Sequence, residues 1–411
     1  MSLIADLKSL EPSQRSAIWG SYLGWTLDAF DFFLLVFVKT AIGKEFGASD
    51  EEVSELLFLT LAARPFGAFT FGWLAERFGR RPILMVVILA FSAFSFLSGL
   101  AGTLAQLKLI RTLFGFAMGG EWGIGASLVM ETIPPRLRGF VSGLLQSGYP
   151  SGYFLASLVY YLLFVQIGWR GMFFVGIAPA LLVFLIRMHV KESPVHVAMV
   201  ARPRVSPVVE IARNWKIALY LVVLMTAFNF FSHGTQDQYP TFLQKQHGFD
   251  THLTGTLTAI MNVGAMVGGI SFGIWSERLG RRRAIIIASL LALPMIPLWA
   301  FSSTPLMLGL GALLIQVAVQ GAWGIVPVHL NELSPAMARG LFPGFAYQLG
   351  NLIASRNAPF QAWFAHQYGG NYGLALALVA GVTAVVLAIW TALGPERKNV
   401  DFAPEVAPAH E

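Results

Sequence analysis

Long apolar runs separated by short polar segments dominate the pattern of the chain. A helix needs about 20 residues to cross the hydrocarbon core of a bilayer. Twelve runs of suitable length lie near residues 18–38, 54–74, 82–102, 106–130, 140–164, 170–188, 216–242, 253–275, 284–302, 306–330, 341–365 and 372–393. The pattern therefore predicts an all-α membrane protein with twelve transmembrane helices.

The longest polar interruption divides these runs into two sets. It covers residues 190–214 and contains three prolines and several charges. We expect residues 1–189 to form a first six-helix half and residues 190–214 a cytoplasmic linker. Residues 215–411 then form a second six-helix half that ends in a cytoplasmic tail.

The composition supports a membrane protein, and the absence of catalytic motifs argues against an enzyme. Of 411 residues, 55% are hydrophobic and 12% are charged, whereas soluble domains carry about 25% charged residues. Cysteine is absent, and no phosphate-binding loop, catalytic triad or metal-ligand spacing occurs. We expect no metal, no cofactor and no nucleic-acid partner, and a monomer surrounded by lipid.

The distribution of basic residues indicates the orientation. Most of the 28 Lys and Arg residues fall on one side if both termini lie in the cytoplasm, and cytoplasmic loops carry such an excess. The N-terminal segment lacks the features of a cleavable signal. We expect a multi-pass protein of a bacterial-type inner (plasma) membrane.

An internal repeat relates the two halves. Segment 72–81 matches segment 273–282, 201 residues later. The same offset relates Trp122-Gly123 to Trp323-Gly324, Glu131 to Glu332, and Arg138-Gly139 to Arg339-Gly340. Duplicated halves with the substrate site between them are a known transporter arrangement.

The two repeated loops have the form G-x-x-x-E-R-x-G-R-R and resemble the signature of the major facilitator superfamily. A glycine there allows a tight helix exit, and the charges can form a network that opens and closes as the halves rock. The alternative is that the arginines only set orientation. The resemblance implies alternating access and gating roles for Gly72, Glu76, Arg77, Arg80, Gly273, Glu277, Arg278 and Arg281.

A second resemblance concerns the seventh expected helix. The run from Asn229 to Thr241 matches the N-x-x-[S/T]-H-x-[S/T]-Q-D-x-x-x-T pattern of Jen-type lactate/pyruvate permeases, which belong with the sialate:proton symporters. Asp28 and Asp31 are similar to the D-x-x-D of sialate and aromatic-acid symporters. Glu121 lies in a G-G-E-W-G segment shared by several proton symporters.

Ionisable residues inside membrane helices are costly and usually face a cavity or a partner. His233 and Asp237 are four residues apart and so share a helix face. They can share a proton, or they can form a purely structural pair. The candidates for proton coupling are Asp28, Asp31, Glu121, His233 and Asp237.

Arg64, in the second expected helix, can bind a carboxylate with two parallel hydrogen bonds, and Jen-type permeases similarly have an arginine in this helix. The alternative is a salt bridge to Asp28, Asp31 or Glu121. Arg356 is expected near the middle of the eleventh helix, as a second carboxylate clamp or a partner of Asp237. The candidates for substrate binding are Arg64, Asn229, His233, Gln348, Asn351 and Arg356.

These patterns predict a proton-coupled symporter of a short monocarboxylate such as lactate or pyruvate. Three alternatives stay open. The same fold can carry sialate or an aromatic acid with a proton, it can export drugs or metabolites, or the chain can be a non-transporting membrane sensor or a channel.

Overall fold

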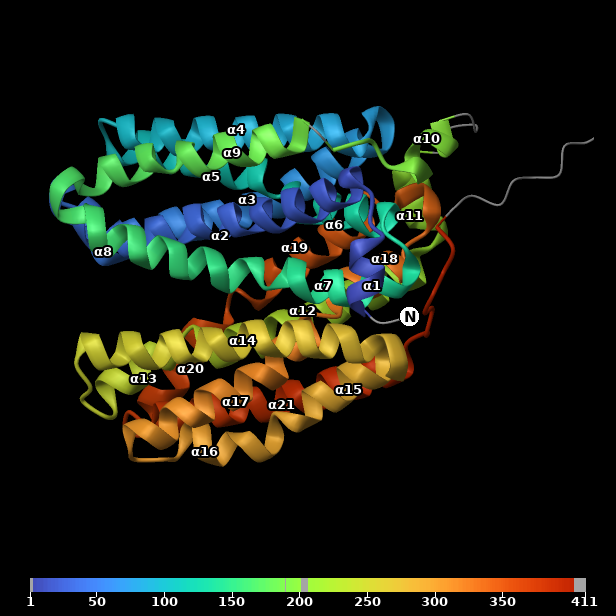
Figure 1. Cartoon of the computed structure of the whole chain (residues 1–411). Coiled ribbons are helices and arrows are strands. Elements are labelled where there is room, and N and C mark those ends of the chain that lie inside the picture. Colours follow the sequence, from blue (N-terminus) through green and yellow to red (C-terminus); the bar gives the residue numbers. More distant parts are fainter. Residues whose placement is uncertain (1–2, 189, 201–205, 403–411) are drawn as a thin grey trace, which may run out of the picture.

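The computed structural model describes residues 3–188, 190–200 and 206–402, and within these ranges every regular element is a helix (Figure 1). The first half contains α1 (Leu3–Lys8), α2 (Pro12–Phe46), α3 (Asp50–Phe78), α4 (Arg80–Leu100), α5 (Leu104–Met118), α6 (Glu121–Thr132), α7 (Arg138–Gln146), α8 (Gly148–Val175) and α9 (Ile177–Met188). The linker contains α10 (Pro194–Val200) and α11 (Pro207–Arg213).

The second half contains α12 (Trp215–Gln236), α13 (Tyr239–Lys245), α14 (Thr251–Leu279), α15 (Arg281–Leu291), α16 (Ile296–Ala300), α17 (Pro305–Trp323), α18 (Val326–Leu333), α19 (Phe342–Ala354), α20 (Asn357–Gln367) and α21 (Tyr372–Leu393). Short 3₁₀ turns lie at Pro135–Leu137, Leu293–Met295 and Ala336–Ala338. Figure 1 shows the halves as two neighbouring bundles, with α10 and α11 at one end, here called the linker end.

Within the described residues, nine helical stretches are long and apolar enough to cross a membrane. The three other expected spans are also helical. The span 18–38 lies within α2, which buries Asp28 and Asp31. The span 170–188 is divided between α8 and α9, and the span 341–365 between α19 and α20.

Local sequence explains the helix ends that place the repeated loops. Ser49 and Glu52 form a capping box at the start of α3. Gly79 follows α3 and Gly280 follows α14, with φ of 108° and 90°, a backbone region that favours glycine. The tight helix end that the repeat predicts therefore occurs at its second glycine, Gly79 or Gly280, and not at Gly72 or Gly273.

The two bundles touch closely near the linker end. There, α3 packs on α19, α7 on α14, and α6 on α18. The first glycine of each repeat allows this approach. A Cβ atom at Gly72 would lie 2.9 Å from Cα of Leu341, and one at Gly273 would lie 2.4 Å from the carbonyl oxygen of Gly139.

Candidate functional site

A cavity of about 550 Å³ lies between the two halves. Helices α2, α3 and α8 form one wall, and α12, α14, α19 and the end of α17 form the other. The polar and charged residues that line it are Lys39, Arg64, Gln146, Tyr149, Tyr153, Asn229, Ser232, His233, Gln236, Asp237, Thr258, Asn262, Gln320, Tyr347 and Asn351. Small-molecule sites usually have volumes of about 300–1,000 Å³, so the cavity is large enough for a metabolite.

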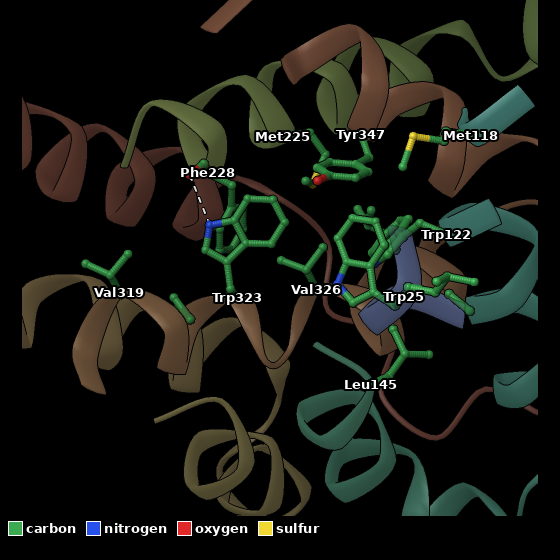
Figure 2. Packing of buried hydrophobic residues seen from close by; sticks show 14 of the residues in the cluster. Trp25, Met118, Trp122, Leu145, Met225, Phe228, Val319, Trp323, Val326 and Tyr347 are labelled. Atoms are coloured by element: carbon green, nitrogen blue, oxygen red, sulfur yellow. Dashed lines mark hydrogen bonds between the residues drawn. The ribbon is translucent and has the colours of Figure 1, made fainter. Parts of the chain in front are cut away.

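Four aromatic residues, Trp25, Trp122, Trp323 and Tyr347, pack together beside this cavity, and we call them the aromatic floor (Figure 2). All of them except Trp122 line the cavity. The ring of Tyr347 lies 4.7 Å from that of Trp122 and 5.6 Å from that of Trp323. Trp323 also donates to the carbonyl oxygen of Phe228 at 3.1 Å. The repeated tryptophans thus meet one tyrosine from opposite halves.

Arg64 and Asp28 form a buried ion pair at the wall of the first half. Arg64 Nη2 lies 2.9 Å from Asp28 Oδ1, and the guanidinium also lies 5.6 Å from the ring centre of Phe32. Asp28 Oδ2 and Arg64 Nε have no hydrogen-bond partner among the described residues. The salt bridge to Asp28, which was the alternative role of Arg64, is therefore present, and Arg64 also lines the cavity.

Asp31 and Glu121 are buried in the first half but do not line the cavity. Asp31 accepts a hydrogen bond from Ser95 at 3.0 Å. It also lies within electrostatic reach of Arg111, whose three guanidinium nitrogens have no hydrogen-bond partner among the described residues. The guanidinium carbon of Arg111 lies 3.7 Å from the ring centre of Phe114.

The wall of the second half contains a linked set of polar side chains. His233 Nδ1 lies 3.1 Å from Asp237 Oδ2, and Nε2 lies 2.9 Å from Asn351 Oδ1. Both ring nitrogens therefore face an oxygen, so a proton on either nitrogen finds an acceptor. Asn229 lines the cavity one turn from His233 and donates to the carbonyl oxygen of Met225.

Two of the expected substrate-binding residues lie away from the cavity. Gln348 is buried, and its amide atoms have no partner within the described part of the chain. Arg356 is exposed and falls in the break between α19 and α20 instead of mid-helix. Neither lines the cavity. The neighbouring Asn351 and Ala358 face it instead, so the structure does not bring Arg356 to the site or to Asp237.

At the linker end, two equivalent contacts join the halves. Glu76 accepts a hydrogen bond from the backbone N–H of Gly340 at 2.5 Å. Glu277, its repeat counterpart, accepts from the N–H of Gly139 at 2.6 Å. Each acidic residue of the repeat therefore binds the glycine of the other half, which closes this end.

In each repeat one arginine, Arg80 or Arg281, pairs with the acidic residue of these contacts. The arginine directly after that acidic residue, Arg77 or Arg278, does not. Arg80 pairs with Glu76 at 3.0 Å and with Glu131 at 3.2 Å. Arg281 pairs in the same way with Glu277 and Glu332, both at 2.9 Å. Arg77 and Arg278 are exposed and join no ion pair among the described residues.

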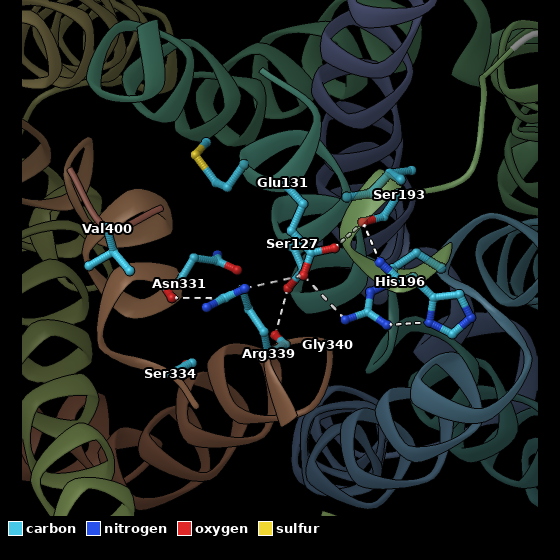
Figure 3. Close-up of polar contacts among 12 residues, drawn as sticks. Ser127, Glu131, Ser193, His196, Asn331, Ser334, Arg339, Gly340 and Val400 are labelled. Atoms are coloured by element: carbon cyan, nitrogen blue, oxygen red, sulfur yellow. Dashed lines mark hydrogen bonds and ion pairs between the residues drawn. The ribbon is translucent and has the colours of Figure 1, made fainter. Parts of the chain in front are cut away.

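A direct link across the halves runs through Arg339. Its Nη1 lies 3.9 Å from Glu131 Oε1, and its carbonyl oxygen accepts from Ser127 at 2.7 Å (Figure 3). Glu131 also accepts a short hydrogen bond from Ser193 of the linker. The linker is thus attached to the same charge network.

The linker and the tail bind the repeated loops in similar ways. Glu192 accepts from the backbone N–H groups of Arg80 and Arg81 at the start of α4. Glu396 does the same for Arg281 and Arg282 at the start of α15. A carboxylate at a helix N-terminus satisfies free N–H groups and complements the helix dipole.

The last described residue, Phe402, is buried between the two halves. Its ring centre lies 3.7 Å from the guanidinium carbon of Arg138 and 4.0 Å from that of Arg339. Arg138 also donates to the carbonyl oxygen of Val400 at 2.7 Å. The tail therefore contacts one arginine from each half.

Replacing Gly143 with Ala is expected to disfavour the arrangement closed at the linker end. A Cβ atom there would lie 2.3 Å from the carbonyl oxygen of Gly269, and backbone atoms cannot rotate away. We expect a cost of about 1–3 kcal/mol, measured as faster hydrogen–deuterium exchange in α7 and α18. Gly255→Ala is the control, because a Cβ at Gly255 meets no atom within 4 Å. Equal exchange in both variants would contradict the expectation.

Some cavity residues were not among the sequence-based candidates. Trp25, Asp28, Phe32, Val36 and Lys39 follow α2 at intervals of three or four residues, which places them on one helix face. All of them line the cavity except Asp28, which was already a sequence-based candidate. This spacing was a usable signal, whereas the aromatic residues Tyr149, Tyr153 and Tyr347 have no charge or spacing that separates them from packing residues.

Two families of membrane transporters match this chain. The family described as Major Facilitator Superfamily matches residues 21–251, and the family described as Sugar (and other) transporter matches residues 212–398. A solved structure of the proton:xylose symporter XylE aligns with 94% of this chain and 97% of its own at a TM-score of 0.78 and 19% identity. That likeness concerns the fold alone and confirms the expected twelve-helix architecture.

Several curated proteins are similar over most of their length. A probable 4-methylmuconolactone transporter of Cupriavidus pinatubonensis is 32% identical, covering 86% of this chain and 84% of its own. The sialic acid transporter NanX of Escherichia coli is 28% identical, covering 90% and 91%. A carboxylic acid transporter protein homolog of Saccharomyces cerevisiae is 28% identical, covering 94% and 67%.

Proposed function

We propose, from the premise that the chain belongs to the major facilitator superfamily, that it moves a carboxylic acid together with a proton. The two halves would rock about the cavity and expose it to each side of the membrane in turn. Nine described helical stretches are long and apolar enough to cross a bilayer, and relatives named for the transport of organic acids support this class of substrate.

The observation that carries the proposal is the Arg64–Asp28 pair at the cavity wall. A guanidinium in a desolvated site binds a carboxylate strongly, because charge-assisted bidentate bonds are short and directional. An incoming acid would compete with Asp28 for Arg64. A proton on Asp28 would release the arginine, so that binding of the proton and of the acid favour each other.

His233 and Asp237 form a second place for a proton, on the opposite wall. Asn351 and Asn229 lie beside them and supply donors and acceptors for the remaining polar groups of the acid. Asp31, near Arg111, and Glu121 are further candidates within the first half. The contacts of Glu76 and Glu277 would act as the gate, together with Arg80 and Arg281.

The distribution of basic residues supports the proposed orientation. With the linker and both termini in the cytoplasm of a bacterial-type cell, the closed linker end faces inward. The cavity then receives its acid from outside. This arrangement suits uptake across the inner membrane.

A short monocarboxylate such as lactate or pyruvate is our first candidate, because the pattern from Asn229 to Thr241, in α12 and α13, matches Jen-type permeases. The cavity volume of about 550 Å³ and its aromatic walls favour a second candidate, a larger acid such as sialate or an aromatic acid. Relatives named for sialic acid and for cis,cis-muconate support the second candidate.

Uptake of labelled lactate into proteoliposomes tests the proposal. One proton with one monoanion moves no net charge, so an inward pH gradient should drive accumulation and a potassium diffusion potential should not. Asp237→Asn should reduce this uptake. Competition with sialate and benzoate then ranks the candidates. Saturable, gradient-driven uptake is incompatible with a sensor or a channel, and absence of uptake for every acid would refute the proposal.

A further inference from the structure

A second cation, Lys39, lies on the cavity wall at a distance from Arg64. Lys39 belongs to α2, and its ammonium donates to Ser54 Oγ of α3 at 3.2 Å. The side chain is half-buried and lines the same cavity as Arg64. Within the described part of the chain, Lys39 takes part in no ion pair.

Helix geometry places this cation near the mouth of the cavity. Lys39 follows Asp28 by eleven residues on one face of α2, which corresponds to about 16 Å along a helix that rises 1.5 Å per residue. Ser54 precedes Arg64 by ten residues on α3, or about 15 Å. The two cations therefore lie at opposite ends of one wall, with Arg64 at the inner end.

Among the described residues that line the cavity, each charged side chain except Lys39 is paired with another described residue. The charged or imidazole side chains among the lining residues are Lys39, Arg64, His233 and Asp237. Arg64 is bound to Asp28, and His233 to Asp237. An anion that enters from the open end therefore meets an unpaired positive charge first at Lys39. Low-dielectric walls strengthen such a field and raise the local concentration of the opposite charge.

The surface between the two cations is apolar. Phe32, Phe33 and Val36 of α2 and Leu57 and Leu61 of α3 line it. The hydrocarbon part of a small acid can contact these side chains while its carboxylate interacts with a cation at one end. A lysine ammonium suits a transient stop, because it is a point charge on a flexible stem and has no bidentate geometry.

We propose that Lys39 forms an outer anion-binding subsite, which holds the carboxylate of a small organic acid before the acid reaches Arg64. The role of this subsite in transport rests on the proposed function. Its attraction of anions into the cavity does not rest on that function, so the role and the attraction can be tested separately.

The absence of cysteine allows the potential beside Lys39 to be measured directly. Val36→Cys places one thiol in the cavity about one turn inward from Lys39. Its labelling rate from outside is compared for anionic 2-sulfonatoethyl and cationic 2-trimethylammonioethyl methanethiosulfonate. Lys39→Gln should lower the anionic-to-cationic ratio about tenfold, and Lys39→Arg should preserve it.

Lys44→Gln is the matched control, because Lys44 belongs to the same end of α2 but is exposed and outside the cavity lining. It should leave the ratio unchanged. The inference is overturned if Lys39→Gln leaves the ratio as in the parent, or if Lys44→Gln lowers it equally.

Lactate uptake tests the place of the subsite on the transport path. With the cysteine-free chain, Lys39→Gln should raise KM about tenfold at low ionic strength and leave Vmax nearly unchanged, and added salt should reduce the difference. An unchanged KM alongside normal wild-type uptake removes Lys39 from the path but leaves the proposed function standing. A changed labelling ratio without wild-type uptake of any acid refutes the proposed function but supports the anion subsite.

Discussion

Uptake is expected to fall at least about a hundredfold when Arg64 is replaced by Gln, because a lost charge-assisted partner costs roughly 3 kcal/mol or more, and 1.4 kcal/mol is tenfold. The variant loses the cation proposed to bind the carboxylate and leaves Asp28 buried without its partner. Initial rates of acid uptake in proteoliposomes, driven by a fixed pH gradient, provide the measurement.

Two further variants separate binding from stability. Arg64→Lys keeps the charge but loses the planar fork, so we expect uptake between those of the wild type and of Arg64→Gln. The double change Arg64→Gln with Asp28→Asn removes the unpaired buried charge and should recover thermal stability without recovering uptake. Wild-type rates in Arg64→Gln would rule out the carboxylate-binding role.

The second large effect is expected at the proposed gate, where a substitution should reduce stability. Arg281 is fully buried and pairs with Glu277 and Glu332. Arg281→Gln leaves Glu332 buried without its cation, and breaking such a pair costs about 3–5 kcal/mol. The apparent Tm in detergent should fall by roughly 5–10 °C.

The repeat supplies a control for this variant. Arg278→Gln removes the same charge from the same loop, but Arg278 is exposed and unpaired among the described residues, so its Tm should stay within about 1 °C. The double change Arg281→Met with Glu332→Leu should recover much of the loss, because an apolar pair of similar volume leaves no buried charge. Equal Tm losses in Arg281→Gln and Arg278→Gln would contradict the assigned roles.

Periodicity and the repeat were enough to predict the fold. Twelve apolar runs fixed the number of segments, and one constant offset related Glu76 to Glu277 and Gly139 to Gly340. The structure shows why these residues are repeated, because each glutamate binds the glycine of the opposite half. A contact between halves cannot be read from either copy of the repeat alone.

The site was only partly predictable, because a sequence does not give the direction of a side chain at a helix break. Arg356 was expected mid-helix, but α19 ends at Ala354 and α20 begins at Asn357, and the arginine is exposed there. Arg77 and Arg80 are a second example, because both are arginines of the same repeated segment. Of the two, Arg80 is buried and pairs with Glu131, whereas Arg77 is exposed. A charged residue within an apolar run is a candidate for the site. The direction of its side chain depends on how the helices pack, which the sequence does not give.

In the proposed transport cycle, the insertion of Phe402 between Arg138 and Arg339 would make the segment 398–402 a reporter of which side of the membrane the cavity faces. If the halves separate at the linker end as proposed, these two arginines should move apart, and the aromatic ring should lose one or both of its neighbours. Residues 398–402 would then become accessible to proteases. A bulky protein fused to the C-terminus would act on the same equilibrium, so that such a fusion would alter the transport cycle that it is meant to report.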